Sequence, residues 1–186
     1  LVCSCAPLAC HGDVIAEVWQ ELFQSHAWAK QHRKPSMAYA GIGARATPSH
    51  IQPLISKVAR RLALRGFTLR SGGAVGADQA FEHGCVGFPA EIFLPWKGYQ
   101  SNASMLWNIP PGAMQIASCI HPAWQGLSHS EQKFIAGAGL QILGQELNKP
   151  VDFVVCWTPD GAQSESERSR KTGGTGQAIA LADRWQ

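Results

Sequence analysis

The sequence predicts an α/β fold in three layers, a mostly parallel sheet with helices on both faces. Two observations indicate it. From Met37 onward, short apolar runs alternate with segments of helical periodicity, and this alternation is typical of parallel strands joined by crossover helices. Glycine-rich turns follow several of the apolar runs. Because ligands of such sheets bind beyond the carboxyl ends of the strands, we expect a site at that edge.

The elements can be justified in chain order. Apolar positions at helical spacing predict the helices, Gly66 ends the first of them, and Pro95 ends the third strand. A Pro-Pro-Gly sequence within residues 96–112 predicts a long loop, and a nearly continuous apolar run predicts a buried last strand. The predicted strands are 37–41, 67–70, 91–94 and 151–157, and the helices are 48–65, 76–83, 113–120, 129–147 and 176–184. The alternation then calls for one more strand where the sequence stops.

Residues 1–36 are predicted to be an appendage to this domain, which covers residues 37–186. Asp13 is placed to cap an amphipathic helix over residues 13–31, and a polar linker follows. Cys3, Cys5 and Cys10 with His11 indicate either a metal cluster, a disulfide or an unstructured terminus, but their spacing matches no zinc pattern. We therefore predict no metal site.

The composition is that of a globular protein with one domain. Of 186 residues, 45% are hydrophobic and 16% charged, and the net charge of +3 permits a polyanionic partner without requiring one. No apolar stretch approaches the roughly 20 residues that span a bilayer, and the N-terminus lacks a secretory signal pattern. We therefore predict a cytoplasmic protein that does not bind membranes, in which Cys85, Cys119 and Cys156 are buried free thiols.

Three glycine-rich turns, within residues 39–45, 71–78 and 172–178, are the main functional signal. Turns without Cβ atoms can aim backbone N–H groups at a bound anion, which is the chemistry that holds phosphate. Lys97 and Thr158 follow two other strands and are predicted to lie at the same edge. The predicted ligand-binding residues in the turns are Gly41, Gly43, Arg45, Ser71, Gly72, Gly73, Gly76, Asp78, Gly173, Gly174, Thr175, Gly176 and Gln177.

Several of these residues have structural alternatives. The glycines could serve only tight turns, and Ser71 could cap its turn instead of binding phosphate. Asp78 could simply be stabilised in the first helical turn by the helix dipole. Alternatively, it could orient the loop or bond a ribose hydroxyl. Trp96, Tyr99 and Trp107 could stack on a base or pack their loop, and the polar residues 160–171 predict a mobile loop or lid.

The turns resemble those of the SLOG superfamily, which unites DprA (Smf) with the LOG proteins. The resemblance covers residues 37–186 and is strongest to short DprA-like proteins of phages and bacteria. It is carried by Tyr-Ala-Gly-Ile-Gly-Ala-Arg at 39–45, Ser-Gly-Gly-Ala-Val-Gly-Ala-Asp at 71–78, Leu-Pro-Trp-Lys-Gly at 94–98, Cys-Trp-Thr-Pro-Asp-Gly at 156–161 and Gly-Gly-Thr-Gly-Gln-Ala at 173–178.

This resemblance implies a Rossmann-like domain that binds a nucleotide or nucleotide-derived small molecule, without a further cofactor, and that pairs into a homo-oligomer such as a dimer. The DprA branch binds single-stranded DNA in recombination, and the LOG branch hydrolyses the N-glycosidic bond of nucleoside monophosphates.

The closing motif departs from the LOG pattern. Thr172 stands where that pattern has proline, Gln177 where it has threonine, and Ala180 where it has the catalytic glutamate. An alanine cannot exchange protons, so the sequence favours binding over catalysis. Hydrolysis through Asp78 or Glu82 remains an alternative, as does binding of single-stranded DNA, against which the modest net charge counts. The helix that contains Phe134 lacks the basic and polar residues expected of a ligand site, so we assign it no ligand role.

Overall fold

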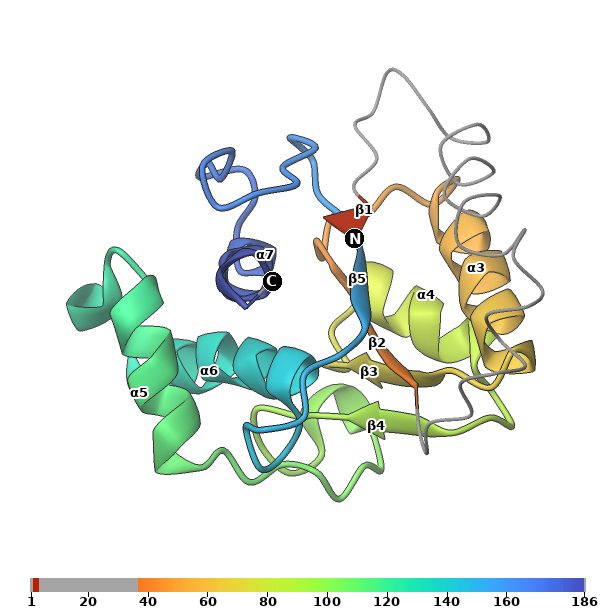
Figure 1. The fold of residues 1–186 in the computed structure, drawn as a ribbon, viewed down its shortest axis with the longest axis horizontal. Helices are drawn as coiled ribbons and strands as arrows, with labels where there is room; N and C mark the ends of the chain where they lie inside the picture. The colour runs from red at the N-terminus through yellow and green to blue at the C-terminus, as the bar shows by residue number, and fades with distance from the viewer. Residues whose placement is uncertain (1, 4–36, 186) are drawn as a thin grey trace.

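The centre of the molecule is a parallel β-sheet (Figure 1). The structure is a computed structural model that describes residues 2–3 and 37–185. Every strand pair in the sheet is parallel, and the strand order is β1-β5-β2-β3-β4. The strands are β1 (Val2–Cys3), β2 (Ala38–Gly43), β3 (Thr68–Ser71), β4 (Ala90–Ile92) and β5 (Phe153–Trp157). The predicted α/β fold of the Rossmann-like type is therefore confirmed.

Helices cover both faces of this sheet, as predicted (Figure 1). Side chains alternate along β2, so that Tyr39 packs with α3 and α4 while Ala40 and Ile42 pack with α6 and α7. The helices are α3 (Gln52–Leu64), α4 (Ala77–Gly84), α5 (Pro111–Ile120), α6 (His129–Leu143) and α7 (Thr175–Arg184), with short 3-10 turns at Tyr99–Ser101 and Trp124–Gly126. The sheet is the middle of three layers.

The predicted boundaries differ from the observed ones where caps and prolines act. The helix predicted over 129–147 ends at Leu143 because Gly144 adopts a φ of 75°, and it begins at a capping box between Ser128 and Glu131. Pro111 was predicted to lie in a loop but begins α5, since the first helical turn tolerates proline.

The predicted helix over residues 13–31, the linker and the cysteine cluster lie outside the described residues, apart from the cysteine in β1. That strand occupies the outer edge beside β5. Within residues 2–3 and 37–185, no helix is long and apolar enough to cross a membrane. Cys85 and Cys156 are buried, as predicted, but the prediction for Cys119 is wrong, because α5 exposes its side chain.

Helices α3 and α4 pack closely at Gly84. A Cβ atom at this glycine would overlap the backbone carbonyl of Ser56 and lie 2.7 Å from the Cβ of Ala59. Both neighbours belong to the rigid interior of α3, so they cannot move aside cheaply. This close approach at the C-terminal end of α4 fixes how α4, which carries Asp78 in its first turn, packs against α3.

Gly84→Ala is therefore expected to lower the free energy of unfolding by about 1–3 kcal/mol, the usual cost of overpacking a close-packed contact. Urea denaturation would measure it. Gly126→Ala is the matched control, because a Cβ there meets no atom within 4 Å. Equal unfolding free energies for the two variants would contradict the predicted constraint.

Candidate functional site

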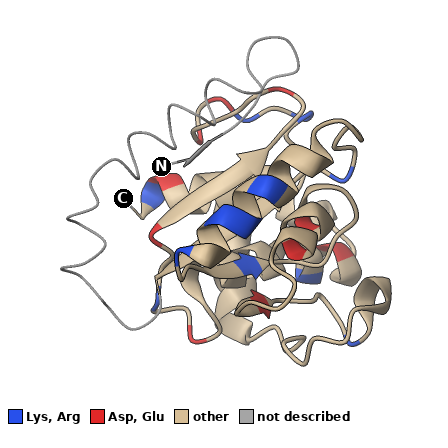
Figure 2. Ribbon diagram, turned by 90° about the vertical axis from the view of Figure 1, so that its right-hand side faces the viewer, with Lys and Arg blue, Asp and Glu red and all other residues tan. Residues whose placement is uncertain are grey.

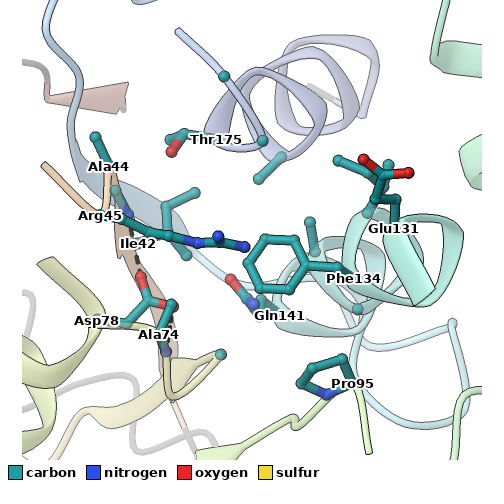
Figure 3. Close-up of a pocket in the computed structure, with 18 of the residues that line it drawn as sticks. Ile42, Ala44, Arg45, Ala74, Asp78, Pro95, Glu131, Phe134, Gln141 and Thr175 are labelled. Atoms are coloured by element: carbon teal, nitrogen blue, oxygen red, sulfur yellow. Dashed lines mark hydrogen bonds between the residues drawn. The ribbon is translucent and has the colours of Figure 1, made fainter. Parts of the chain in front are cut away.

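A cavity of about 520 Å³ lies at the carboxyl edge of the sheet (Figure 3). This volume lies within the usual range for sites that hold small molecules. Parts of all three glycine turns line it, together with α6, the N-terminus of α7 and the residues after β4. The sequence-predicted residues in the lining are Gly43, Arg45, Gly72, Asp78, Gly173, Gly174 and Thr175.

The turn after β2 contributes a cation to this cavity. The guanidinium carbon of Arg45 lies 4.5 Å from the centre of the Phe134 ring, a cation–π contact across the cavity (Figure 3). Arg45 is exposed and makes no ion pair with any residue that the structure describes. Its charge is therefore free to meet an anion.

Asp78 joins the first two turns. Its Oδ1 accepts a hydrogen bond from the Gly43 N–H at 3.2 Å and its Oδ2 accepts one from the Ala74 N–H at 3.4 Å. Of the roles that the sequence left open, orientation of the loops is the one these contacts support. The Ala74 amide consequently points to a protein carboxylate instead of into the cavity.

Burial raises the pKa of the Asp78 carboxyl from its ordinary value of 3.8 to about 7, although hydrogen bonds from the backbone oppose the shift. The nearby Glu82 adds to it by charge repulsion. The pKa of Glu82 is itself raised to about 7, mainly by burial. Glu82 accepts a hydrogen bond from Asn102 at 2.8 Å and does not line the cavity.

Three glycines of the second turn allow close approaches. A Cβ at Gly72 would overlap the amide nitrogen of Gln141 and lie 2.9 Å from the Asp78 Oδ2. Gly76 has a φ of 90° and a Cβ there would lie 2.5 Å from the Arg45 carbonyl oxygen, while Gly73 has a φ of 73°. These contacts and angles exclude other residues sterically, so packing accounts for the glycines without any ligand.

The third turn presents free backbone donors. Gly173, with a φ of 61°, and Gly174 precede α7, and no side chain caps the helix. The N–H groups of Gly173, Gly174 and Thr175 find no acceptor among the described residues. Lys171, also exposed, lies beside them in the cavity wall. Unpaired amides at a helix N-terminus with an adjacent cation form a favourable site for an anion.

The segment before this turn is fastened by carboxylates. The Oδ2 of Asp160 accepts hydrogen bonds from Ser169 and Thr172, each at 2.5 Å. Glu165 pairs with both Arg168 and Arg184. The contacts tie residues 160–171, which the sequence predicts as a mobile loop, to each other, to Thr172 and to α7, and so position Lys171.

Eight predicted site residues lie outside the cavity lining. Gly41 packs against Phe81, and the Ser71 hydroxyl donates to the Gly41 carbonyl at 2.8 Å, which is the capping alternative. The Gln177 amide donates to the Ala117 carbonyl at 3.4 Å, away from the cavity. The other five are Gly73, Gly76, Lys97, Thr158 and Gly176. Arg70, in β3 before the second turn, pairs with Glu91 at 2.6 Å and does not line the cavity either.

Helix α6 forms a whole wall that the sequence reasoning missed. Phe134 and Gln141 line the cavity with the small residues Gly137 and Ala138 between them. The spacing i, i+3, i+4, i+7 places all four on one helix face. Small residues between an aromatic ring and an amide on one helix face could have indicated a cavity wall. The face carries little charge, so it did not resemble a binding site in the sequence. The other missed residues of α6 are Ser130, Glu131 and Ile135.

Ala180, at the position of the LOG glutamate, is fully buried in the core between α7 and the sheet. It does not line the cavity. Among residues 2–3 and 37–185 there is also no group of three or more His, Cys, Asp or Glu side chains that could hold a metal ion.

No protein-family model matches the chain, and neither a curated protein nor a solved structure matches it. The α/β fold and the geometry of the cavity therefore carry the functional argument.

The raised pKa of Asp78 predicts a pH dependence of stability. Between about pH 4 and pH 7 the folded protein keeps a proton on this carboxyl that the unfolded chain releases, so the free energy of unfolding falls as the pH rises. Below this window both states are protonated, and above it both are ionised.

Asp78→Asn removes that titration. The unfolding free energy of the wild type minus that of the variant should fall from pH 4 to pH 7, as measured by urea denaturation at each pH. A constant difference would show that the carboxyl ionises at its ordinary pKa, and a rising one that its pKa is lowered in the folded protein; either would contradict the prediction. Glu82 titrates in both proteins, so its contribution largely cancels.

Proposed function

We propose that this protein binds a nucleotide or nucleotide-derived small molecule in the cavity at the carboxyl edge of the sheet. The observation that carries the proposal is that one cavity joins unpaired helix N-terminal amides and two free cations to an aromatic ring and an amide on α6. The resemblance of the glycine turns to those of DprA-like proteins of the SLOG superfamily supports the same assignment.

The anionic part of the ligand is assigned to the third turn. Unpaired N–H groups of Gly174 and Thr175 and the positive end of the α7 dipole attract phosphate. Lys171, before the third turn, and Arg45, in the first turn, add two positive charges to the lining. Glu131 is the acidic residue most exposed there, and its carboxylate is held by the Ser128 hydroxyl and N–H in the capping box.

The base of the ligand is assigned to the α6 wall. Phe134, Pro95 and Trp96 supply apolar and aromatic surface there. The Arg45 guanidinium already stacks on the Phe134 ring at 4.5 Å, and a planar base can take the same kind of contact with either group.

Binding is a better proposal than hydrolysis for this site. The position of the LOG glutamate is buried in the core as Ala180. Asp78 is the buried carboxyl at the cavity, and both of its oxygens already accept backbone hydrogen bonds. A group held in this way organises the loops better than it transfers protons to a ligand.

The test is calorimetric titration with AMP, GMP, CMP and UMP. We expect at least one to bind, and Arg45→Gln and Lys171→Gln each to weaken that binding about tenfold or more, because each removes a charge-assisted contact to phosphate. Arg170→Gln is the matched control, since Arg170 is exposed beside Lys171 but lies outside the cavity lining. Failure of the wild type to bind any of the four nucleotides would refute the proposal.

A second candidate function, contact with single-stranded DNA, is favoured by the surface of α3. The exposed side of this helix carries Lys57, Arg60, Arg61 and Arg65 and the helix has no acidic residue (Figure 2). A cluster of cations on one face attracts a phosphate backbone.

This candidate predicts oligonucleotide binding that weakens steeply as salt rises. Replacing Lys57 and Arg60 together by Gln should reduce the slope of log affinity against log salt by about 1.4, or about 0.7 for each contact with a single strand. Fluorescence anisotropy with a labelled oligonucleotide would measure it, with Lys171→Gln as a control at the cavity. An absence of binding at low salt would eliminate the candidate.

A further inference from the structure

We propose that Gln141 determines specificity by reading the hydrogen-bonding edge of the ligand's base, so that the site selects base-containing phosphates over sugar phosphates. This inference rests on the proposed function, because it assigns a role within the same cavity. It names the part of the ligand that α6 recognises.

Gln141 lies in the wall of the cavity. The residue lies near the C-terminal end of α6, is only 8% exposed and lines the cavity. Figure 3 shows its amide pointing into the cavity between Asp78 and Phe134. It is two helical turns beyond Phe134 on the same face of α6, about 10 Å along the axis.

The amide is also without a partner. Neither its nitrogen nor its oxygen makes a hydrogen bond with any residue that the structure describes. The amide is not sealed in the core, because its atoms keep access to the cavity. A ligand that enters the cavity can therefore supply the hydrogen-bond partners that the protein does not.

The lack of a side chain at Gly72 leaves space for the Gln141 amide. A Cβ at Gly72 would overlap the Gln141 nitrogen. Gly72 has no positive φ that would itself require glycine. A side chain at position 72 would therefore have to displace the ends of the Gln141 and Asp78 side chains, whereas glycine leaves both in place.

The chemistry of the amide favours a base. A glutamine amide offers a donor and an acceptor side by side, and nucleobase edges carry the complementary pair, so that two hydrogen bonds form at once. A sugar phosphate without a base has no planar edge of this kind. The third turn lies at the Phe134 end of α6, since a Cβ at Gly174 would lie 3.5 Å from the Phe134 ring. Gln141 is two helical turns further along α6, so a ligand with its phosphate at the third turn extends its base toward Gln141.

The experiment compares nucleotides with ribose 5-phosphate by calorimetry. The wild type is expected to bind at least one of AMP, GMP, CMP and UMP about tenfold or more tightly than ribose 5-phosphate. Gln141→Leu should lose that preference while its affinity for ribose 5-phosphate stays unchanged. Gln141→Met, with an unbranched side chain of nearly the same length, should give the same result.

Two readouts separate recognition from a structural role. Gln132→Leu makes the same chemical change on α6 outside the cavity, where the amide donates to the Trp124 carbonyl at 3.3 Å, and should keep the preference. Without ligand, Gln141→Leu should unfold at a temperature no lower than the wild type, because the Gln141 amide makes no hydrogen bond within the described protein that the change would remove.

The inference is overturned if both Gln141 variants keep the preference for the nucleotide, or if the wild type binds ribose 5-phosphate as tightly as every nucleotide. In either case nucleotides still bind, so the proposed function survives. If the wild type binds none of the four nucleotides, the proposed function fails and the role of Gln141 fails with it.

Discussion

The Asp78 carboxylate is the contact on which the geometry of the site depends. It accepts hydrogen bonds from Gly43 at the end of β2 and from Ala74 after β3, and it stands on the first turn of α4. One buried group thus holds two neighbouring strand ends and a helix in a single arrangement. The cost is the burial of an ionisable group, which appears as a pKa raised to about 7.

The three glycine turns have different roles in this arrangement. In the first two turns the glycines let Asp78, α4 and Gln141 approach the backbone, so their role is steric. Only the third turn presents unpaired amides, because α7 begins there without a side-chain cap. The same sequence feature therefore supports packing in two places and presents free amides in one, although all three turns line the cavity.

The fold was largely predictable, whereas the site was predictable only in part. Strand and helix periods are local properties, so the alternation placed β2, β3, β5 and the five helices within a few residues of their observed bounds. The turns were correctly placed at one edge of the sheet, because parallel strands share it. Whether a turn residue such as Ser71 or Gln177 faces the cavity depends on its neighbours in space. The Ser71 hydroxyl donates to the Gly41 carbonyl and the Gln177 amide to the Ala117 carbonyl, so neither side chain faces the cavity.

By itself, the sequence determined the α/β class and the three glycine turns, since both depend on patterns over a few consecutive residues. Only the tertiary structure decided that α6 closes the cavity with Phe134 and Gln141. Those residues are more than 50 positions from the nearer of the first two turns, and their side chains carry no charge that would mark them. Packing of α6 against the sheet brings an apolar ring and an unpaired amide to the turns, and that long-range contact defines what the cavity can bind.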